Sequence, residues 1–312
     1  MTSRVSVATL TYGDRKAFLY KVIDRLLSQD FDGIYIYCNG ISLDNLNIIK
    51  AKYTNKNITI LYSDENLGSA GGYHELLRYI KVHDKSNYLL LLDDDNLVPE
   101  NCFEIISKLD IKENELYSFH RSDRVLAKKV KELEKPEKII GSANSFLGRD
   151  FFSIFKSSEA KYHGDLAAAP YGGLLLNRKS LDTGVLPRKE LYLYADDYEF
   201  TYRLISEFNF EVVFSEQLII EDLEKSYHLK KGTRLLNNRY SHASNLQLYY
   251  SVRNNTWLGL KRKKSKVIFL SNLLICTGVF SIQFLLTLKF KNVFLFLKAI
   301  KDGYILHKKI GS

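Results

Sequence analysis

Three consecutive carboxylates, Asp93, Asp94 and Asp95, follow an uncharged run at residues 88–92. Such a run is typical of a strand that is buried on both faces of a parallel sheet. Because side chains alternate along an extended segment, we expect Asp93 and Asp95 to share a direction and Asp94 to be free for another contact. Oxygen ligands are those that Mg²⁺ or Mn²⁺ prefers, so we interpret Asp93 and Asp95 as metal ligands. A solvated acidic turn is the alternative.

A second acidic cluster is formed by Asp196, Asp197 and Glu199, which begin a helical pattern that also includes Arg203. An aspartate at a helix start is common as an N-cap. Two aspartates, a glutamate and an arginine within about two helical turns exceed what capping needs. The cluster is therefore a second candidate for chemistry.

The elements that must position these clusters alternate between strand and helix. The hydrophobic pattern predicts strands at 5–10, 33–38, 58–62 and 89–92, with helices at 18–27, 43–53 and 73–82. Further strands are predicted at 116–119, 174–176, 212–214 and 218–220, and a solvated helix or excursion at 121–138. This alternation predicts an α/β fold with a doubly wound, mostly parallel sheet.

Unusual residues follow the first four predicted strands, at 12–15, 39–40, 66–72 and 93–95. Ligands of doubly wound sheets bind beyond the carboxyl ends of the strands, so this coincidence favours a nucleotide site. The glycine-rich stretch 66–72 is neither a P-loop nor a Gly-x-Gly-x-x-Gly motif. Its glycines would let the backbone approach a flat or phosphorylated group and begin a helix that favours an anion. An ordinary glycine-containing loop is the alternative.

Length and cysteine content limit the class of protein. The chain has 312 residues, enough for one large core or for a core domain with a smaller appendage. Its three cysteines are far apart and lack metal-ligand spacing, which suits a reducing compartment. The first residues form a predicted strand, so we expect no secretory signal peptide.

The formal net charge of +9 is concentrated in the tail. From Lys261 onward there are eleven Lys or Arg residues against one acid, Asp302, whereas residues 1–260 are nearly neutral. A nucleic-acid binder would more often spread its basic residues over a groove on the folded body, so we predict no nucleic-acid partner. A basic tail interleaved with Leu, Phe and Ile indicates an anionic membrane surface instead.

Residues 267–288 carry no formal charge and are long enough to span a bilayer. Polar residues are scattered along this stretch, and lysines follow it as well as precede it, so no inside–outside asymmetry results. We favour a position in the membrane interface, with a second apolar helix over 294–304. A transmembrane span is one alternative, and packing on the body or in a homo-oligomer is another.

Taken together, residues 4–260 resemble the inverting GT-A glycosyltransferases of family 2, in particular the galactofuranosyltransferase and rhamnosyltransferase branch. Residues 9–15 resemble the first nucleotide-binding loop of that family, and Asn39-Gly40 resembles the second. Residues 66–72 resemble the Asn-Leu-Gly-x-Ala-Gly-Gly stretch of the galactofuranosyl branch, and residues 249–255 resemble a stretch common to galactofuranosyl and rhamnosyl enzymes.

The resemblance also implies roles for the acidic residues. Asp93-Asp94-Asp95 stands where the family has its Asp-x-Asp motif, so Asp93 and Asp95, with His228 as third ligand, would hold Mn²⁺ or Mg²⁺. In the family segment that resembles 196–203, the second acid is the catalytic base, which here is Asp197. The implied nucleotide-sugar-binding residues are Thr9, Arg15, Asn39, Asn66, Gly68 and Asp94. The implied acceptor-binding residues are Tyr171, Gly172, Gly173, Asp196 and Glu199.

The resemblance therefore implies a GT-A catalytic domain at residues 1–260, followed by a helical membrane-associating segment at 261–312. The expected reaction is metal-dependent transfer of galactofuranose from UDP-galactofuranose to a lipid-linked saccharide at the cytoplasmic face of the inner membrane, in O-antigen or capsule synthesis. The enzyme would be peripheral or monotopic there. A rhamnosyltransferase using dTDP-rhamnose is the first alternative. A nucleotidyltransferase is a less favoured alternative, because it should have a basic, glycine-rich first loop, which residues 11–15 do not resemble. A non-catalytic membrane-bound adaptor is another, but it would tolerate loss of the acids, and both acidic clusters are present.

Overall fold

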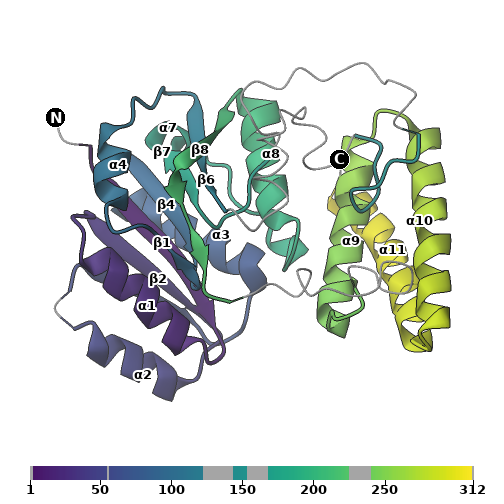
Figure 1. Cartoon of the computed structure of the whole chain (residues 1–312), viewed down its shortest axis with the longest axis horizontal. Coiled ribbons are helices and arrows are strands. Elements are labelled where there is room, and N and C mark those ends of the chain that lie inside the picture. The colour runs from purple at the N-terminus through teal and green to yellow at the C-terminus, as the bar shows by residue number, and fades with distance from the viewer. Residues whose placement is uncertain (1–2, 55, 122–142, 153–167, 225–239, 311–312) are drawn as a thin grey trace. The chain divides into compact units, whose positions relative to one another are not determined.

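The computed structural model describes residues 3–54, 56–121, 143–152, 168–224 and 240–310 (Figure 1). Two compact units are present. Unit 1 comprises residues 1–136, 162–192 and 196–224, and unit 2 comprises 137–161, 193–195 and 225–312. The domain boundary expected at residue 260 stays a prediction; the helix over 245–262 belongs to unit 2.

Unit 1 is built on a seven-stranded sheet with the order β3-β2-β1-β4-β7-β6-β8. Its four N-terminal strands are mutually parallel, as predicted: β1 (Val5–Tyr12), β2 (Gly33–Asn39), β3 (Ile58–Ser63) and β4 (Tyr88–Asp93). The other members are β6 (Glu115–His120), β7 (Leu174–Asn177) and β8 (Glu211–Ile219). A separate two-stranded ladder joins β5 (Asn96–Leu97) to β9 (Glu221–Asp222).

The helices of unit 1 are α1 (Lys16–Leu27), α2 (Leu43–Lys52), α3 (Gly68–His83), α4 (Cys102–Lys108), α7 (Arg178–Asp182) and α8 (Asp196–Phe208), with a 3-10 turn at Lys189–Leu191. Residues of α1, α2 and α4 share one apolar core with alternate residues of β1, β2 and β4. Helix α3 contacts β1 and β2. The α/β prediction with a mostly parallel sheet is thereby confirmed.

Two details of unit 1 differ from the sequence-based prediction. Strand β7 runs antiparallel to β4 and β6, so the sheet is mixed rather than parallel throughout. The two short strands predicted at 212–214 and 218–220 are one strand, β8, with an irregularity in its pairing at His120. Because β7 runs against β4, the turn before β7 reaches the edge of the sheet where β4 ends. The excursion predicted at 121–138 lies almost entirely outside the described residues.

Unit 2 contains α9 (Asn245–Arg262), α10 (Lys266–Leu286) and α11 (Phe290–Ile310). Its apolar core joins Tyr240 and Val252 to Phe269, Phe280 and Phe296 from the last two helices. Ser244 caps α9, because its hydroxyl accepts a hydrogen bond from the backbone amide of Gln247. The side-chain oxygen of Gln247 in turn accepts one from the backbone amide of Ser244. Within the described part of the chain, α10 is the one helix long and apolar enough to cross a membrane.

Candidate active site

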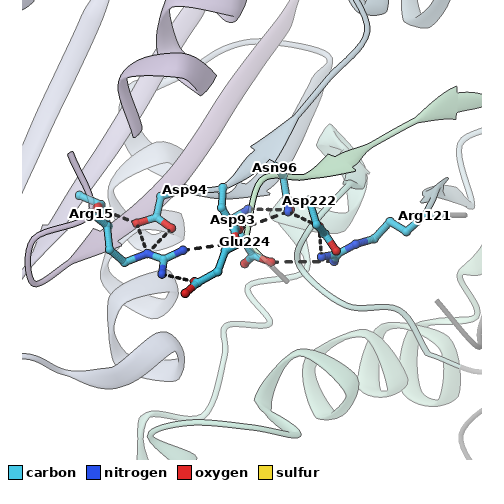
Figure 2. Close-up of polar contacts among 9 residues, drawn as sticks. Arg15, Asp93, Asp94, Asn96, Arg121, Asp222 and Glu224 are labelled. Atoms are coloured by element: carbon cyan, nitrogen blue, oxygen red, sulfur yellow. Dashed lines mark hydrogen bonds and ion pairs between the residues drawn. The ribbon is translucent and has the colours of Figure 1, made fainter. Parts of the chain in front are cut away.

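The three consecutive aspartates lie at the carboxyl end of β4, where the sequence placed them (Figure 2). Asp93 is the last residue of the strand, and 44% of its side chain is exposed. Asp95 is largely buried, and Arg15 Nη2 lies 3.3 Å from its Oδ2. Burial, together with the charges of Asp93 and Asp94, raises the pKa of Asp95 to about 7. Negative charge therefore accumulates at this edge beyond what Arg15 neutralises.

Asp94 is not free for a ligand, contrary to the prediction. Its side chain is buried, and it accepts a hydrogen bond from Thr11 Oγ1 at 2.7 Å and another from Arg15 Nε at 2.8 Å. Alternation along the strand does turn Asp94 away from its neighbours, but toward β1 rather than toward solvent. Asp94 thus anchors Arg15, which also pairs with Glu224 (Figure 2).

Two further charged residues, Asp222 and Arg121, border Asp93 and were missed by the sequence analysis. The β5–β9 ladder places Asp222 opposite Asn96, whose amide donates to it at 2.9 Å. Arg121 forms an ion pair with Asp222 and lies 3.9 Å from Asp93 Oδ2 (Figure 2). Nothing in the local pattern of residues 221–222 indicates a partner more than a hundred positions earlier, since a two-residue ladder leaves no periodic signal.

The carboxylates at the end of β4 suit a divalent cation in their chemistry. Among the residues that the structure describes, no three His, Cys, Asp or Glu side chains converge as a complete metal site. Mg²⁺, however, is commonly held by one or two carboxylates, with substrate phosphates and water completing its shell. Asp93 and Asp95 fit that arrangement, and the raised pKa of Asp95 reports the uncompensated charge that a cation would neutralise. His228, the expected third ligand, lies outside the described residues.

The glycine-rich stretch forms the first turns of α3 rather than a loop before it. Gly68 adopts a φ of +70°, and a Cβ built there would collide with the carbonyl oxygen of Tyr192. Ala70 donates its amide to the same oxygen at 3.1 Å. Glycine is required at position 68 because both the backbone conformation and the close approach exclude a side chain. A cavity of about 610 Å³ opens beside this turn, lined in part by Asn66, Glu75 and Tyr192.

Two predicted nucleotide-binding residues are internal to the fold. Asn39 is buried at the end of β2, where its amide donates to Asn66 Oδ1 and to the Gly68 carbonyl, at 3.1 and 3.0 Å. It also accepts from the Leu67 amide at 2.8 Å, so it fixes the start of α3. Thr9 is fully buried inside β1, which continues to Tyr12, so its side chain does not reach the ligand-binding edge. A direct contact between Thr9 and a nucleotide therefore stays a prediction, which the burial of Thr9 does not support.

The second acidic cluster begins α8, as predicted. Asp196 is buried and accepts a hydrogen bond from Ser69 Oγ in the first turn of α3 at 2.8 Å. Burial raises the pKa of Asp196 to about 7. Asp197 is partly exposed, and its Oδ1 accepts the Tyr198 amide at 2.8 Å. Burial, with the neighbouring charge of Asp196 and that of Asp93, raises the pKa of Asp197 well above its ordinary range.

The two acidic clusters lie within electrostatic range of one another. The charge of Asp93 raises the pKa of both Asp196 and Asp197. Tyr73 in α3 donates its hydroxyl to the Leu92 carbonyl at 2.7 Å, and burial with the charges of Asp93, Asp94 and Asp196 raises the pKa of that hydroxyl. One end of the sheet therefore presents two sets of carboxylates, more than a hundred residues apart in sequence, to the same space.

The turn at residues 171–173 supports this edge of the sheet instead of lining a pocket. Tyr171 is buried and packs on Tyr73, with ring centroids 4.2 Å apart. A Cβ on Gly172 would lie 2.7 Å from Asp93 Oδ2, and Gly173 donates its amide to the Leu91 carbonyl at 2.9 Å. The acceptor-binding role expected for Tyr171 and Gly173 stays a prediction, which their burial does not support. Gly172 lets the backbone pass close to Asp93.

Glu199 does not face a ligand, contrary to expectation. It is fully buried, and its carboxylate pairs with Arg203 Nε at 2.7 Å and with Arg188 Nε at 2.9 Å. Arg203 in turn donates to the Leu186 carbonyl at 2.7 Å. Glu199 and Arg203, the charged residues that capping does not need, thus form a buried ion pair four residues apart within α8. Their contacts with Arg188 and Leu186 hold the helix against the segment before it.

The variant Glu199→Ala is expected to lower the free energy of unfolding by about 3–5 kcal/mol, because it leaves the buried Arg203 guanidinium uncompensated. Urea denaturation followed by circular dichroism measures the change. Glu113→Ala is the matched control, since Glu113 is an exposed partner of Lys179 and should contribute less than about 1 kcal/mol. Equal losses in both variants would contradict the assignment of Glu199 to the scaffold.

The backbone that leads into α8 is strained. Tyr192, Tyr194 and Ala195 all adopt positive φ, at 62°, 67° and 60°. Such conformations cost free energy in non-glycine residues and cluster at functional sites. The carbonyls of Leu193 and Tyr194 both accept the amide of Asn254, a residue of the 249–255 stretch, at 2.8 Å. Asn254 is completely buried, so its side chain fixes the backbone at Leu193 and Tyr194. The sequence analysis did not specify this positioning role.

Comparison with known proteins agrees with this geometry. Residues 6–152 match the family model Glycosyl transferase family 2. Residues 6–152 are thus similar to a family 2 glycosyltransferase domain, and this match supports glycosyl transfer as the activity of the chain. No curated protein matches the sequence.

Solved structures share the GT-A fold with this chain. The complex of S. aureus TarS 1-349 with UDP-GlcNAc has a TM-score of 0.54 at 14% identity, over 96% of this chain and 80% of TarS. A second TarS 1-349 structure has a TM-score of 0.50 at 14% identity, over 86% and 70% of the two chains. GalNAc-T7 with UDP, GalNAc and Mn²⁺ has a TM-score of 0.50 at 11% identity, over 81% of this chain and 47% of that one.

Proposed function

We propose that this glycosyltransferase moves galactofuranose from UDP-galactofuranose, with inversion, to a lipid-linked glycan in bacterial surface polysaccharide synthesis. The resemblance of residues 66–72 to the galactofuranosyl branch supports the donor sugar. The UDP-GlcNAc and UDP complexes of TarS support a UDP-sugar. Transfer of rhamnose from dTDP-rhamnose is the second candidate, favoured by the 249–255 stretch that both branches share.

The observation that carries the proposal is the electrostatic contact between the two acidic clusters. A nucleoside diphosphate sugar needs one group that stabilises the departing diphosphate and another that accepts a proton from the attacking hydroxyl. Helix α3 contacts both clusters, since Tyr73 donates to the Leu92 carbonyl beside Asp93, and Ser69 donates to Asp196 beside Asp197. Asp93 can therefore act on the departing diphosphate, and Asp197 on the attacking hydroxyl, in one transfer.

Asp93 and Asp95 would hold Mn²⁺ or Mg²⁺, as the Mn²⁺ in the GalNAc-T7 structure supports for the fold. Such an ion supplies charge neutralisation for the diphosphate as it leaves. Arg15 and Arg121 lie on either side of this carboxylate pair and limit its repulsion before the donor binds (Figure 2). Gly172 keeps the space beside Asp93 free of a side chain.

Asp197 acts as the general base. Its partial exposure leaves one face of the carboxylate accessible to an acceptor hydroxyl, and its raised pKa makes it a stronger base than an ordinary aspartate. The hydroxyl loses its proton to Asp197 as its oxygen bonds to the anomeric carbon, and the bond from that carbon to the diphosphate breaks. One displacement inverts the anomeric centre. Asp196, hydrogen-bonded to Ser69, fixes the start of α8.

The acceptor is proposed to be held at a membrane, with the enzyme peripheral or monotopic on the cytoplasmic face of the inner membrane. The basic composition from Lys261 onward and the apolar helix α10 support this location. A lipid-linked acceptor explains why a glycosyltransferase would carry such a segment.

A panel of nucleotide sugars tests the donor. The melting temperature of the purified chain is measured with Mn²⁺ and each sugar, and UDP-galactofuranose is expected to give the largest increase. A donor at 100 times its Kd stabilises the fold by about 2.7 kcal/mol, which a thermal scan resolves. A larger shift with dTDP-rhamnose would favour the second candidate, and no shift with any nucleotide sugar would reject both.

A further inference from the structure

Helix α10 has two dissimilar faces. One face packs inside unit 2 through Phe269, Asn272, Cys276, Phe280 and Phe284, all buried. The opposite face exposes large apolar side chains along the length of the helix. We call this surface the apolar face of α10; it consists of Val267, Leu270, Leu274, Ile282, Leu285 and Leu286.

The apolar face is unusual for a surface in contact with water. Val267 and Leu274 are 75% and 69% exposed. The chain carries no formal charge from residue 267 to 288, so no charged side chain interrupts the apolar surface in this stretch. It continues onto α11 through Leu288, Phe290 and Phe294, all exposed. A contiguous exposed apolar surface of this kind marks an interaction site.

The charges around this surface indicate the partner. Lys264 precedes α10, Lys266 is its first residue, and Lys289 and Lys291 follow it. Along α11 the exposed apolar residues are accompanied by Lys298 and Lys301. An apolar stripe bordered by lysines matches a bilayer with anionic headgroups, because the side chains enter the acyl region while the ammonium groups meet phosphates.

The buried face of α10 determines how the helix meets that bilayer. The amide of Asn272 donates to the Asn144 carbonyl and to Asp150 Oδ1, at 2.9 and 2.8 Å. Asn272 Oδ1 accepts the Phe151 amide at 2.9 Å, and the Arg149 guanidinium lies 5.1 Å from the centroid of the Phe280 ring. A charged, non-helical segment is therefore fastened to the middle of α10.

A transmembrane position would carry this segment into hydrocarbon together with the helix. Charged side chains and irregular backbone are not tolerated there in contact with lipid. With the helix lying in the plane of the interface, the apolar face enters the lipid while Asp150 and Arg149 stay on the protein side.

We propose that the apolar face of α10 is the membrane-docking surface of this protein, lying in the plane of an anionic bilayer without crossing it. This inference specifies the proposed membrane association and is independent of the sugar that the enzyme transfers. The other possible occupant, a second copy of the chain, is distinguished by the experiment below.

The test uses the purified full chain and vesicles of phosphatidylcholine with or without phosphatidylglycerol. Leu274→Glu and Leu285→Glu should each reduce co-sedimentation with anionic vesicles by about tenfold or more, because a carboxylate would have to enter the acyl region. Val82→Glu in α3 is the matched control, since Val82 is 63% exposed on unit 1 and should not affect binding. Circular dichroism verifies that each variant is folded.

The depth of α10 in the bilayer is measured with a fluorescent NBD label on the variant Leu274→Cys. The label can be directed to this position because the three native cysteines are buried. A blue shift on addition of anionic vesicles, absent for labelled Val82→Cys, is expected. Unchanged emission from a protein that sediments with vesicles would overturn the proposal. So would a change from oligomer to monomer in the glutamate variants without lipid, or membranes that retain the protein after a carbonate wash. Nucleotide-sugar binding is measured in parallel, so a failed donor proposal and a failed membrane proposal give different results.

Discussion

The variant Asp197→Asn should transfer sugar about 10²–10⁴ times more slowly than the wild-type enzyme, with the affinity for the nucleotide sugar nearly unchanged. Asparagine keeps the oxygen that accepts the Tyr198 amide, so the start of α8 should be preserved. What is lost is the ability to take a proton from the acceptor hydroxyl. Single-turnover transfer from radiolabelled donor measures the rate, and calorimetry measures donor binding.

The control is Asp182→Asn, which makes the same chemical change at an exposed aspartate paired with Arg178. It should transfer sugar at the wild-type rate. A further check comes from pH. Burial raises the pKa of Asp197 well above its ordinary range, so the wild-type rate should increase as the pH rises through that raised pKa and the carboxylate forms. Asp197→Asn should lose this increase. A variant with near wild-type turnover and an unchanged pH profile would remove Asp197 from the role of base.

The variant Asp93→Ala should abolish Mn²⁺-dependent binding of the nucleotide sugar. Loss of an outer-shell partner alone weakens metal binding about 10–100-fold, and loss of a ligand should cost more. Calorimetry with and without Mn²⁺ measures the effect directly. Because the Asp93 side chain is 44% exposed and Arg121 still pairs with Asp222, the fold should persist.

Asp182→Ala serves as the control for this variant and should bind the donor as the wild-type chain does. If Asp93→Ala bound the donor equally well with and without Mn²⁺, at wild-type affinity, then Asp93 would not be a ligand. The comparison with Asp95→Ala is informative as well, since Asp95 also contacts Arg15 and its loss should change stability in addition to metal binding.

The sheet was predictable because its strands leave strong signals. The uncharged run before Asp93 and the alternation of strands with amphipathic helices follow from burial on both faces, and they place residues 93–95 at a ligand-binding edge. The direction of β7 was not predictable, since Leu174–Asn177 is equally apolar in either orientation. Sequence also located Asp196 and Asp197 at a helix start.

The sequence failed where a polar side chain is buried against a distant partner. Asp94, Asn39 and Glu199 look like ligand-binding residues because they are polar and near the expected edge, yet each is satisfied inside the fold. Only tertiary contacts distinguish a carboxylate that faces a ligand from one that faces Thr11 or Arg203. For the same reason Asp222 was missed, as its neighbour Asn96 is remote in sequence.

The contact of Gly68 and Ala70 with the Tyr192 carbonyl, together with the bond from Ser69 to Asp196, joins the donor side of the site to the segment that carries the base. A shift of the first turn of α3 cannot leave Asp196 where it was. If residues 66–72 bind the donor and Asp197 is the base, as proposed, a substitution within 66–72 should change the rate of transfer to the acceptor as well as the preference for the sugar.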